Sequence, residues 1–398
     1  GSKIFSKSIM DKFNIPTSEY IVFKKNYNTV CNYIENSHID KYVIKLSGLA
    51  SGKGVFLPNT NNEAIKIIND IYVNHSYGSN QDIIIEERLY GEEVSVMGFC
   101  NGNEIFLLPQ SQDYKRLHDN NNGSNTGGMG SYAPAHILNT TELQELKHYM
   151  DLIVKDLNYV GILYAGVMRT NTSKNSQFKL LEFNCRFGDP ETQVLMNLLE
   201  SDLYEIINRC YYRLDIKNHD IIKWNKKYVS NVILSHIYYP ARKLQNPIEI
   251  MGINKLDSSV KIYFANVIVD DRKYKTTGGR ILSVVSISDN FFMSLNNIYN
   301  NINKLELEDN NRYYRMDIGY EYLLKENNCN KKIKIAILGS TNGTSTELLL
   351  ESVKNEKIKN ATIEIIISNN CNAGILDKAK KYNVNNMFIS SHGLRKKE

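Results

Sequence analysis

The segment Leu181–Gln193, with the sequence L-E-F-N-C-R-F-G-D-P-E-T-Q, constrains this chain more than any other. Polar residues alternate with apolar ones there, which predicts a strand with Glu182, Asn184 and Arg186 on one face. A carboxylate and an amide oxygen are hard ligands suited to magnesium, and an arginine beside them suits a phosphate. The alternative interpretation is a half-buried strand with a polar outer face.

A turn is expected directly after this strand. Gly188 and Pro190 end the strand, and they place Asp189 and Glu191 at its rim. Oxygen ligands for a metal beside a fixed positive charge are what phosphoryl transfer from ATP needs. Cys185 lies within the same strand but faces away from the site, so we expect a small buried packing residue.

Composition excludes several classes of protein. The 48 basic and 43 acidic residues give a net charge of +5, and no dense basic stripe indicates a nucleic-acid partner. No apolar run approaches the roughly 18 residues of a membrane span. The six cysteines form no C-x-x-C pair, which argues against a zinc site or a disulfide framework. A cytoplasmic protein without nucleic-acid or membrane partners is therefore expected.

A length of 398 residues predicts two or three domains. The first, over residues 1–220, alternates helices with strands and contains a smaller lid subdomain at about residues 20–90. Its strands are expected at Tyr20–Phe23, Tyr42–Lys45, Gly54–Leu57, Ile83–Glu87, Val94–Phe99, Ile105–Leu108, Leu163–Arg169 and Phe178–Asn184. Its helices are expected over residues 1–15, Asn62–Val73, Thr141–Leu157 and Leu195–Arg213.

The remainder of the chain predicts two further regions. Residues 221–325 form a mixed domain, with strands expected at Val229–Ile237, Lys261–Val269 and Gly279–Val285 and a helix at Asp289–Ile302. A polar linker is expected at residues 326–332. Residues 333–398 then open a parallel α/β unit with strands at Ile333–Leu338 and Thr362–Ser368, too few to close a sheet.

One candidate phosphate site follows the strand that ends at Lys45. Gly48, Gly52, Lys53 and Gly54 form a loop in which glycines let backbone amides approach phosphate oxygens. The loop is not a Walker motif, because Gly54 stands where that motif needs Ser or Thr. A plain surface turn is the alternative.

A second candidate is the strand and acidic turn Ile83–Glu93, I-I-I-E-E-R-L-Y-G-E-E. Backbone groups after such a strand can bind an adenine edge, and a carboxylate can hold ribose hydroxyls. The alternative is a strand with a solvated acidic end.

A third candidate is the long polar loop from Ser111 to Tyr132. Asp113, Lys115 and Arg116 could bind a charged substrate, and Thr126–Gly130 would present backbone amides to an anion. A polar loop of this length inside a compact domain is usually functional or disordered. Its asparagine run, Asn120–Asn122, suggests mobility.

These pieces, in this order, resemble the ATP-grasp ligases, and among them the glycinamide ribonucleotide synthetases (phosphoribosylamine–glycine ligases). The resemblance covers about Gly1–Leu323 and rests on R-F-G-D-P-E-T-Q at Arg186–Gln193 and N-T-G-G-M-G at Asn125–Gly130. Thr277–Arg280 and Asp317–Gly319 resemble the C-terminal domain of that family. The resemblance implies an α/β (α+β) class: an ATP-grasp fold, a small mixed C-terminal domain and a partial parallel α/β unit.

The resemblance also implies the ligands of each group. For ATP they are Lys45, Gly48, Gly52, Lys53, Gly54, Glu87, Leu89 and Glu93, the last gripping ribose. For glycine and phosphoribosylamine they are Asp113, Lys115, Thr126, Gly127, Gly128, Gly130, Asp189 and Glu191. For magnesium or manganese they are Glu182 and Asn184, and the catalytic residues are Arg186, Lys45 and Asp189. Ser47 departs from the family, which usually has Asp there.

The implied reaction is ligation of glycine to 5-phosphoribosylamine in purine biosynthesis, with ATP cleaved to ADP and phosphate through glycyl phosphate. One alternative is another ATP-grasp carboxylate–amine ligase. A second is a nucleotide-binding fragment that is inactive without the N-terminal domain of the family, which Gly1–Lys3 would directly follow.

The last segment, Lys334–Glu398, resembles the start of the glycinamide ribonucleotide formyltransferases, with Ile337–Glu347 as a phosphate-binding turn. The catalytic residues of that family come later than Glu398, so no transferase activity is expected. The chain is expected to be a slice of a longer protein in which the synthetase is fused to further purine-pathway domains.

Overall fold

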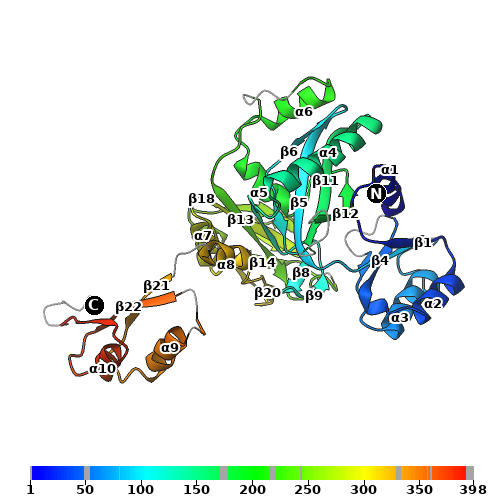
Figure 1. Cartoon of the computed structure of the whole chain (residues 1–398). Coiled ribbons are helices and arrows are strands. Elements are labelled where there is room, and N and C mark those ends of the chain that lie inside the picture. Colours follow the sequence, from blue (N-terminus) through cyan, green and yellow to red (C-terminus); the bar gives the residue numbers. More distant parts are fainter. Residues whose placement is uncertain are drawn as a thin grey trace. The chain divides into compact units, whose positions relative to one another are not determined.

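The computed structural model describes residues 2–48, 54–79, 81–170, 178–215, 221–242, 244–328, 333–355, 357–358 and 361–390. The chain divides into two units, Gly1–Gly319 and Tyr320–Glu398 (Figure 1). Helices and strands are mixed in both units. Within the described residues, no helix is both long and apolar enough to cross a bilayer.

The first unit begins with helix α1 (Lys3–Lys12) and a small antiparallel sheet. The order of this sheet is β1 (Tyr20–Phe23), β4 (Ile83–Glu87), β2 (Tyr42–Leu46) and β3 (Val55–Phe56). Helices α2 (Tyr27–Glu35) and α3 (Asn61–Tyr72) pack on it through an aliphatic cluster that includes Ile34, Ile68 and Ile85, and a short 3-10 helix (Ile39–Lys41) precedes β2. Thr60 caps α3, its side chain accepting the amide of Glu63, which fixes where the helix begins.

A second antiparallel sheet lies at the centre of this unit. Its order is β12 (Phe178–Asn184), β11 (Val160–Thr170), β5 (Gly91–Asn101) and β6 (Ile105–Leu107). Helix α4 (Thr140–Asp156) begins at a capping box made by Asn139 and Glu142 and contacts β6. Helices α5 (Glu191–Leu198) and α6 (Leu203–Tyr211) share a core with β5 and β11 (Figure 1).

A third sheet joins distant parts of the sequence. Its order is β15 (Lys261–Phe264), β18 (Arg280–Ser288), β13 (Tyr228–His236), β10 (Gly130–Ala133) and β7 (Gln112–Asp113), with β20 (Arg312–Tyr313) on β13. Helix α7 (Phe291–Ile302) packs on β13 and β18. The strands β7 and β10 come from the polar segment Ser111–Tyr132 and its end, and they belong to the same sheet as β13, β15 and β18.

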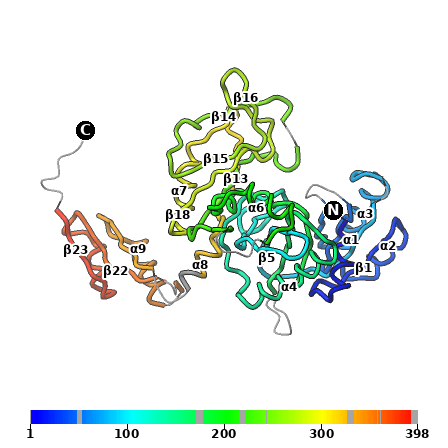
Figure 2. The backbone as a smooth tube through the Cα atoms, turned by 90° about the horizontal axis from the view of Figure 1, so that it is seen from above, coloured from blue at the N-terminus to red at the C-terminus, as the bar shows by residue number. Residues whose placement is uncertain are grey.

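Two smaller sheets complete the first unit. One is the two-stranded hairpin of β8 (Arg116–His118) and β9 (Asn122–Asn125), which follows β7 and precedes β10 in the sequence. The other sheet has the order β16 (Val267–Asp270), β17 (Lys273–Thr276), β14 (Ile248–Met251) and β19 (Glu306–Leu307), with a 3-10 helix at Ile253–Lys255. Figure 2 shows β14 and β16 on the side of the unit away from α4.

The second unit contains α8 (Tyr320–Asn328) and a parallel sheet of order β21 (Ile333–Leu338), β22 (Ala361–Ser368) and β23 (Asn385–Phe388). Helices α9 (Thr344–Lys354) and α10 (Gly374–Lys381) cover it through an aliphatic core around Ile363 and Ile366. A parallel pair needs a crossover helix, and α9 and α10 supply the two crossovers.

Three expectations from the sequence are wrong. The segment Ser111–Tyr132 is not a loop, since β7, β8, β9 and part of β10 lie within it. The helix expected at Leu195–Arg213 is two helices, because the Asp202 side chain accepts the Tyr204 amide and starts α6 anew. The strand expected at Lys261–Val269 is broken between β15 and β16, where Asn266 donates to the Arg280 carbonyl. The domain bounds stay a prediction, and residues 326–328, at the start of the predicted linker, lie in α8.

Candidate active site

Lys45, at the end of β2, is one of two lysines that pair with a single buried carboxylate. Its ammonium contacts Glu86 Oε1, and Lys7 Nζ from α1 lies 2.7 Å from Glu86 Oε2. The exposed fractions of the Lys7, Lys45 and Glu86 side chains are 3%, 9% and 2%. Lys7 also donates to Thr17 Oγ1 at 2.7 Å and to Ser18 Oγ at 3.0 Å.

Burial and charge act in opposite directions on this group of three. Burial alone would raise the pKa of Glu86, but Lys45 and Lys7 outweigh it and the pKa is lowered. Burial lowers the pKa of Lys7, and Glu86 opposes that shift. Two cations on one carboxylate leave a net positive charge in a place with little water, which suits an anion such as a phosphate.

A small, partly open cavity of about 10 Å³ lies beside this group, with room for about one water molecule. Residues of α1, β2, β4 and β12 line it: Lys3, Ser6, Lys7, Met10, Lys45, Ile84, Glu86, Leu181 and Glu182. Sequence reasoning found Lys45 and Glu182 but missed Lys3, Lys7 and Glu86. The helical spacing of Lys3, Lys7 and Met10 was the available signal, because it places all three on one face of α1.

The predicted metal ligands lie together on β12. Asn184 Nδ2 lies 3.5 Å from Glu182 Oε1, so the two side chains share a face, although their register with β11 shifts at Gly166 and Val167. Burial would raise the pKa of Glu182, but Lys115, Lys45 and Lys3 lower it, so the carboxylate stays ionised. Half a turn of the Asn184 amide would direct its oxygen to the same place.

This donor set fits a magnesium ion that takes its other ligands from phosphates and water. Within the described residues there is no group of three His, Cys, Asp or Glu side chains that could hold a metal by themselves.

Two expectations about the end of this strand are wrong. β12 ends at Asn184, so Arg186 is not a strand residue; it is exposed, and its Nη1 donates to the Phe187 carbonyl at 2.8 Å. Cys185 is exposed rather than buried. Both differences have one cause: the chain leaves the strand at Cys185, three residues before Gly188.

The predicted nucleotide residues are only partly brought together. Gly48 and Gly54 are among the described residues, whereas Gly52 and Lys53 lie outside them. The Glu87 amide donates to the Glu19 carbonyl at 2.8 Å and is not free for adenine, and its carboxylate pairs with Lys179 at 2.9 Å. Leu89 lies between β4 and β5. Glu93, on β5, forms an ion pair with Lys115.

Asp113, Lys115 and Glu191 form a second cluster of charges. The Asp113 Oδ1 atom is buried without a hydrogen-bond partner, and burial together with Glu191 raises its pKa well above the usual value. Burial also raises the pKa of Glu191, whose Oε1 accepts the Ser95 hydroxyl at 2.9 Å. Burial would lower the pKa of Lys115, but Glu93 raises it well above the usual value. Two neighbouring acids of raised pKa are a site that can hold or take up a proton.

The glycine-rich segment Thr126–Gly130 does not present its amides to an anion as predicted. Each of the first four amides already donates to another group of the protein: Thr126 to the Lys115 carbonyl (2.8 Å), Gly127 to Tyr239 OH (2.8 Å), Gly128 to Thr126 Oγ1 (3.0 Å) and Met129 to the Tyr114 carbonyl (2.8 Å). Gly130 lies in β10, where a Cβ atom would come within 2.7 Å of the Asn231 carbonyl. Buried amides need partners, and here the chain supplies them itself.

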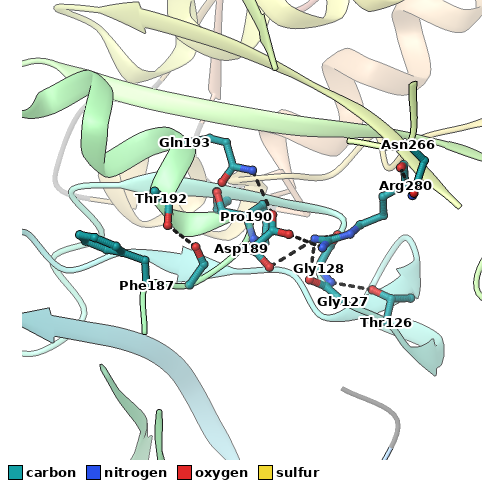
Figure 3. A network of polar contacts seen from close by, with 12 residues as sticks. Thr126, Gly127, Gly128, Phe187, Asp189, Pro190, Thr192, Gln193, Asn266 and Arg280 are labelled. Atoms are coloured by element: carbon teal, nitrogen blue, oxygen red, sulfur yellow. Dashed lines mark hydrogen bonds and ion pairs between the residues drawn. The ribbon is translucent and has the colours of Figure 1, made fainter. Parts of the chain in front are cut away.

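Asp189 lies in the turn that carries the chain from β12 into α5, next to this segment. Its Oδ2 pairs with Arg280 and its Oδ1 accepts Gln193 Nε2 at 3.0 Å (Figure 3). The carbonyl of the adjoining Pro190 accepts Ser131 Oγ at 2.8 Å and Asn231 Nδ2 at 3.2 Å. The turn is therefore held against the third sheet, and the half-exposed Asp189 carboxylate has a defined orientation.

Two family models match the chain. Residues 1–192 match the phosphoribosylglycinamide synthetase ATP-grasp (A) domain, and residues 229–321 match the C domain of the same synthetase. The phosphoribosylamine–glycine ligase of Leptospira interrogans is 36% identical over 81% of this chain and 75% of its own length. The bifunctional purine biosynthetic protein of Dictyostelium discoideum is 37% identical over 81% of this chain. Only 42% of that protein is covered, so the chain spans less than half of such a multifunctional relative.

Solved structures agree with these matches. The phosphoribosylamine–glycine ligase of Thermotoga maritima has a TM-score of 0.68 and 30% identity, and covers 80% of this chain and 78% of its own. A biotin carboxylase domain of Hydrogenobacter thermophilus, in complex with magnesium ADP and bicarbonate, has a TM-score of 0.59 over 77% of this chain and 66% of its own. At 12% identity, that likeness concerns the fold alone.

Proposed function

Because this chain belongs to the phosphoribosylglycinamide synthetase family, we propose that it catalyses the ATP-dependent joining of glycine to 5-phosphoribosylamine in purine biosynthesis. The observation that carries the proposal is the cavity where Lys3, Lys7 and Lys45 meet Glu86 and Glu182. It combines the positive charge that a polyphosphate needs with an ionised carboxylate that a divalent cation needs.

The chemistry requires activation of glycine. A carboxylate is a poor electrophile, because its oxygen is a poor leaving group. Transfer of the γ-phosphoryl group of ATP to a glycine carboxylate oxygen gives glycyl phosphate and ADP. The amine of phosphoribosylamine then attacks the carbonyl carbon, the carbon–oxygen bond to phosphate breaks, and the amine loses a proton. The products are glycinamide ribonucleotide and phosphate.

The side chains of this chain supply charge and position for those steps. Lys45 and Lys7, held by Glu86, would face the phosphates of ATP. Glu182 and Asn184 would hold magnesium or manganese, which neutralises phosphate charge when bound. The acid cluster of Asp113 and Glu191, buried beside Lys115, is the group best suited to accept the amine proton.

The remaining assignments are also proposals. Arg186 would turn toward the transferring phosphoryl group only if its exposed side chain left the Phe187 carbonyl. Residues 1–220 and 221–325 would be the ATP-grasp and C-terminal domains, although the third sheet joins strands of both. We also propose that the chain is fused to further purine-pathway domains, because two of its relatives are named bifunctional and trifunctional purine biosynthetic proteins. A cytoplasmic location is proposed from the resemblance to this family.

The test is release of ADP from ATP and magnesium, measured with glycine and freshly prepared phosphoribosylamine. A Glu182→Gln variant serves as the control. Formation of ADP only when both substrates are present, and its loss in the control, would support the ligase. Binding of ATP without turnover would favour a nucleotide-binding fragment. Absence of ATP binding would overturn the proposal.

A further inference from the structure

Arg280, the first residue of β18, joins three separate parts of the chain through one guanidinium group. Its Nη1 donates to the Gly127 carbonyl at 2.7 Å, to the Gly128 carbonyl at 3.3 Å and to the Asp189 carbonyl at 3.2 Å. Its Nη2 pairs with the Asp189 carboxylate (Figure 3). The side chain is 19% exposed, so it is mostly withdrawn from water.

The backbone that carries Arg280 is itself held in place. The Arg280 carbonyl accepts Asn266 Nδ2 at 2.8 Å, and the preceding carbonyl, that of Gly279, accepts the His236 amide at 3.0 Å. β18 is also paired along its length with β13. The guanidinium thus projects from the beginning of β18, a strand paired on both sides, with little freedom. It can act as a fixed tie, that is, a rigid link between the segments it contacts, rather than as a mobile surface charge.

The glycine segment is packed tightly on this tie. A Cβ atom on Gly127 would lie 3.1 Å from Arg280 Cζ and 3.2 Å from Tyr239 OH. Gly128 has a φ of +106°, and a Cβ atom there would lie 2.6 Å from Asp113 Oδ1. Gly128 requires glycine because of its positive φ and this close contact, whereas a side chain at Gly127 would displace Arg280 and Tyr239 by a few tenths of an ångström.

We infer that Arg280 is a positioning residue: it fixes the segment Thr126–Gly130 against Asp189, and so sets the place of the two amino-group substrates beside Asp113 and Glu191. The part of this inference that concerns substrates rests on the proposed ligase function. The contacts of Arg280 with Gly127, Gly128 and Asp189 do not depend on it. The planar fork of arginine is essential to the role, since three carbonyls and a carboxylate lie around it. A lysine would keep the charge and lose the fork.

The first experiment needs no substrate. Hydrogen–deuterium exchange is followed on the amides of residues 126–129 in the full chain, for the wild type, Arg280→Met and Arg280→Lys. Exchange at least about tenfold faster in both variants, with unchanged exchange in the central strands β5 and β11, is the expected result. Unchanged exchange of the segment in Arg280→Met would overturn the inference, whether or not the chain is a ligase.

The second experiment separates positioning from charge. We expect both variants to raise the KM of glycine and phosphoribosylamine, or to lower kcat/KM for them, by about tenfold to a hundredfold, with little change in the KM of ATP. Full activity in Arg280→Lys would show that only the positive charge matters and would overturn a positioning role. Arg242→Met is the matched control, because Arg242 stacks on Tyr238 and lies outside the site.

Asp189→Asn guards against a folding defect at Arg280. The Asp189 carboxylate is half-exposed, so its neutralisation should leave the chain folded while it removes one end of the tie. Faster exchange at residues 126–129 in Asp189→Asn is expected, smaller than in Arg280→Met because the three carbonyl bonds remain. If exchange in Asp189→Asn matched the wild type and Arg280→Met were unfolded, the segment would not depend on the tie and the inference would fail.

Discussion

Lys45 on β2 forms an ion pair with Glu86 on the neighbouring strand β4, and less than a tenth of either side chain reaches solvent. Glu86 is shared with Lys7, which arrives from α1. One carboxylate therefore orients two lysines from separate elements toward one cavity. Desolvating three charges costs free energy, and their attraction offsets that cost only while all three are present.

Glu86→Gln should consequently destabilise the chain strongly. It leaves Lys7 and Lys45 buried close together without the carboxylate that they share, and we expect a loss of about 3 to 5 kcal/mol in the free energy of unfolding. Urea unfolding at neutral pH measures it, and the affinity for ATP should fall as Lys45 loses its orientation. Asp156→Asn is the control: it removes the half-exposed Lys12–Asp156 pair at 2.6 Å, which should cost less than about 1 kcal/mol. Equal losses in both variants would show that burial of the Glu86 pair has no effect.

Glu182→Gln should remove activity while the chain stays folded. The carboxylate is the only anionic member of the proposed metal pair, and an amide cannot hold a divalent cation comparably. We expect kcat to fall by about a hundredfold to a thousandfold, as when one group that stabilises transition-state charge is lost. Steady-state ADP release at saturating magnesium measures this fall, and circular dichroism confirms the fold. Retention of more than about a tenth of wild-type kcat would rule out Glu182 as the principal metal ligand.

Asp113→Asn should change how stability depends on pH. The folded-state pKa of Asp113 is raised above its unfolded value, chiefly by burial and then by Glu191. The folded state therefore holds this proton more tightly, and stability falls as pH rises from the unfolded pKa of about 4 through the folded one. The asparagine variant lacks this loss, so its stability should decline less between pH 5 and pH 8, and it should be the more stable protein at pH 8.

Thermal unfolding at several pH values makes the comparison. Asp289→Asn is the control, because the Asp289 side chain is 85% exposed and its Oδ1 lies 3.7 Å from Lys227 Nζ. Parallel stability curves for wild type and Asp113→Asn would contradict the prediction. A loss of ligase activity in a variant of raised stability would indicate that the buried acid serves the reaction rather than the fold.

Local patterns were sufficient to predict many of the elements. The bounds of β1 and β4 are those expected from apolar runs that end at polar or turn residues. Glu182 and Asn184 share a face because alternation along a strand is a local property. Arg186 departs from the pattern, since the strand ends two residues before it.

Contacts between distant segments could not be predicted in the same way. Lys7 reads as an ordinary polar residue of an amphipathic helix until α1 is placed on β4. The amides of Thr126–Met129 read as an anion site until Tyr239, far along the chain, takes one of them. The segment Ser111–Tyr132 reads as a loop because its strands are short and polar. They exist through pairing rather than through propensity: β10 pairs with β13, β7 pairs with β10, and β8 pairs with β9.

Arg315→Lys is expected to loosen the β8–β9 hairpin. Arg315 is fully buried, with Nε and Nη2 donating to the two oxygens of Asp317 at 2.8 and 2.7 Å. The same guanidinium donates to the Arg116 carbonyl at 3.1 Å and to Asn121 Oδ1 at 3.1 Å, which anchors the asparagine run predicted to be mobile. Lysine cannot reproduce this fork, so buried acceptors are left without donors.

We expect the free energy of unfolding of Arg315→Lys to fall by about 1 to 3 kcal/mol, the range for leaving a buried hydrogen-bonding group without its partner. Proteolytic cleavage within residues 116–125 should become faster at the same time, because the hairpin would open locally before the sheets unfold. Arg209→Lys is the control on the partly exposed helix α6, where the pair with Glu205 is 3.6 Å long and contributes less than about 1 kcal/mol, and where Nη2 also donates to the Asp215 carbonyl at 2.9 Å. If Arg315→Lys unfolded at the same urea concentration as Arg209→Lys, the buried fork would not be what anchors the hairpin.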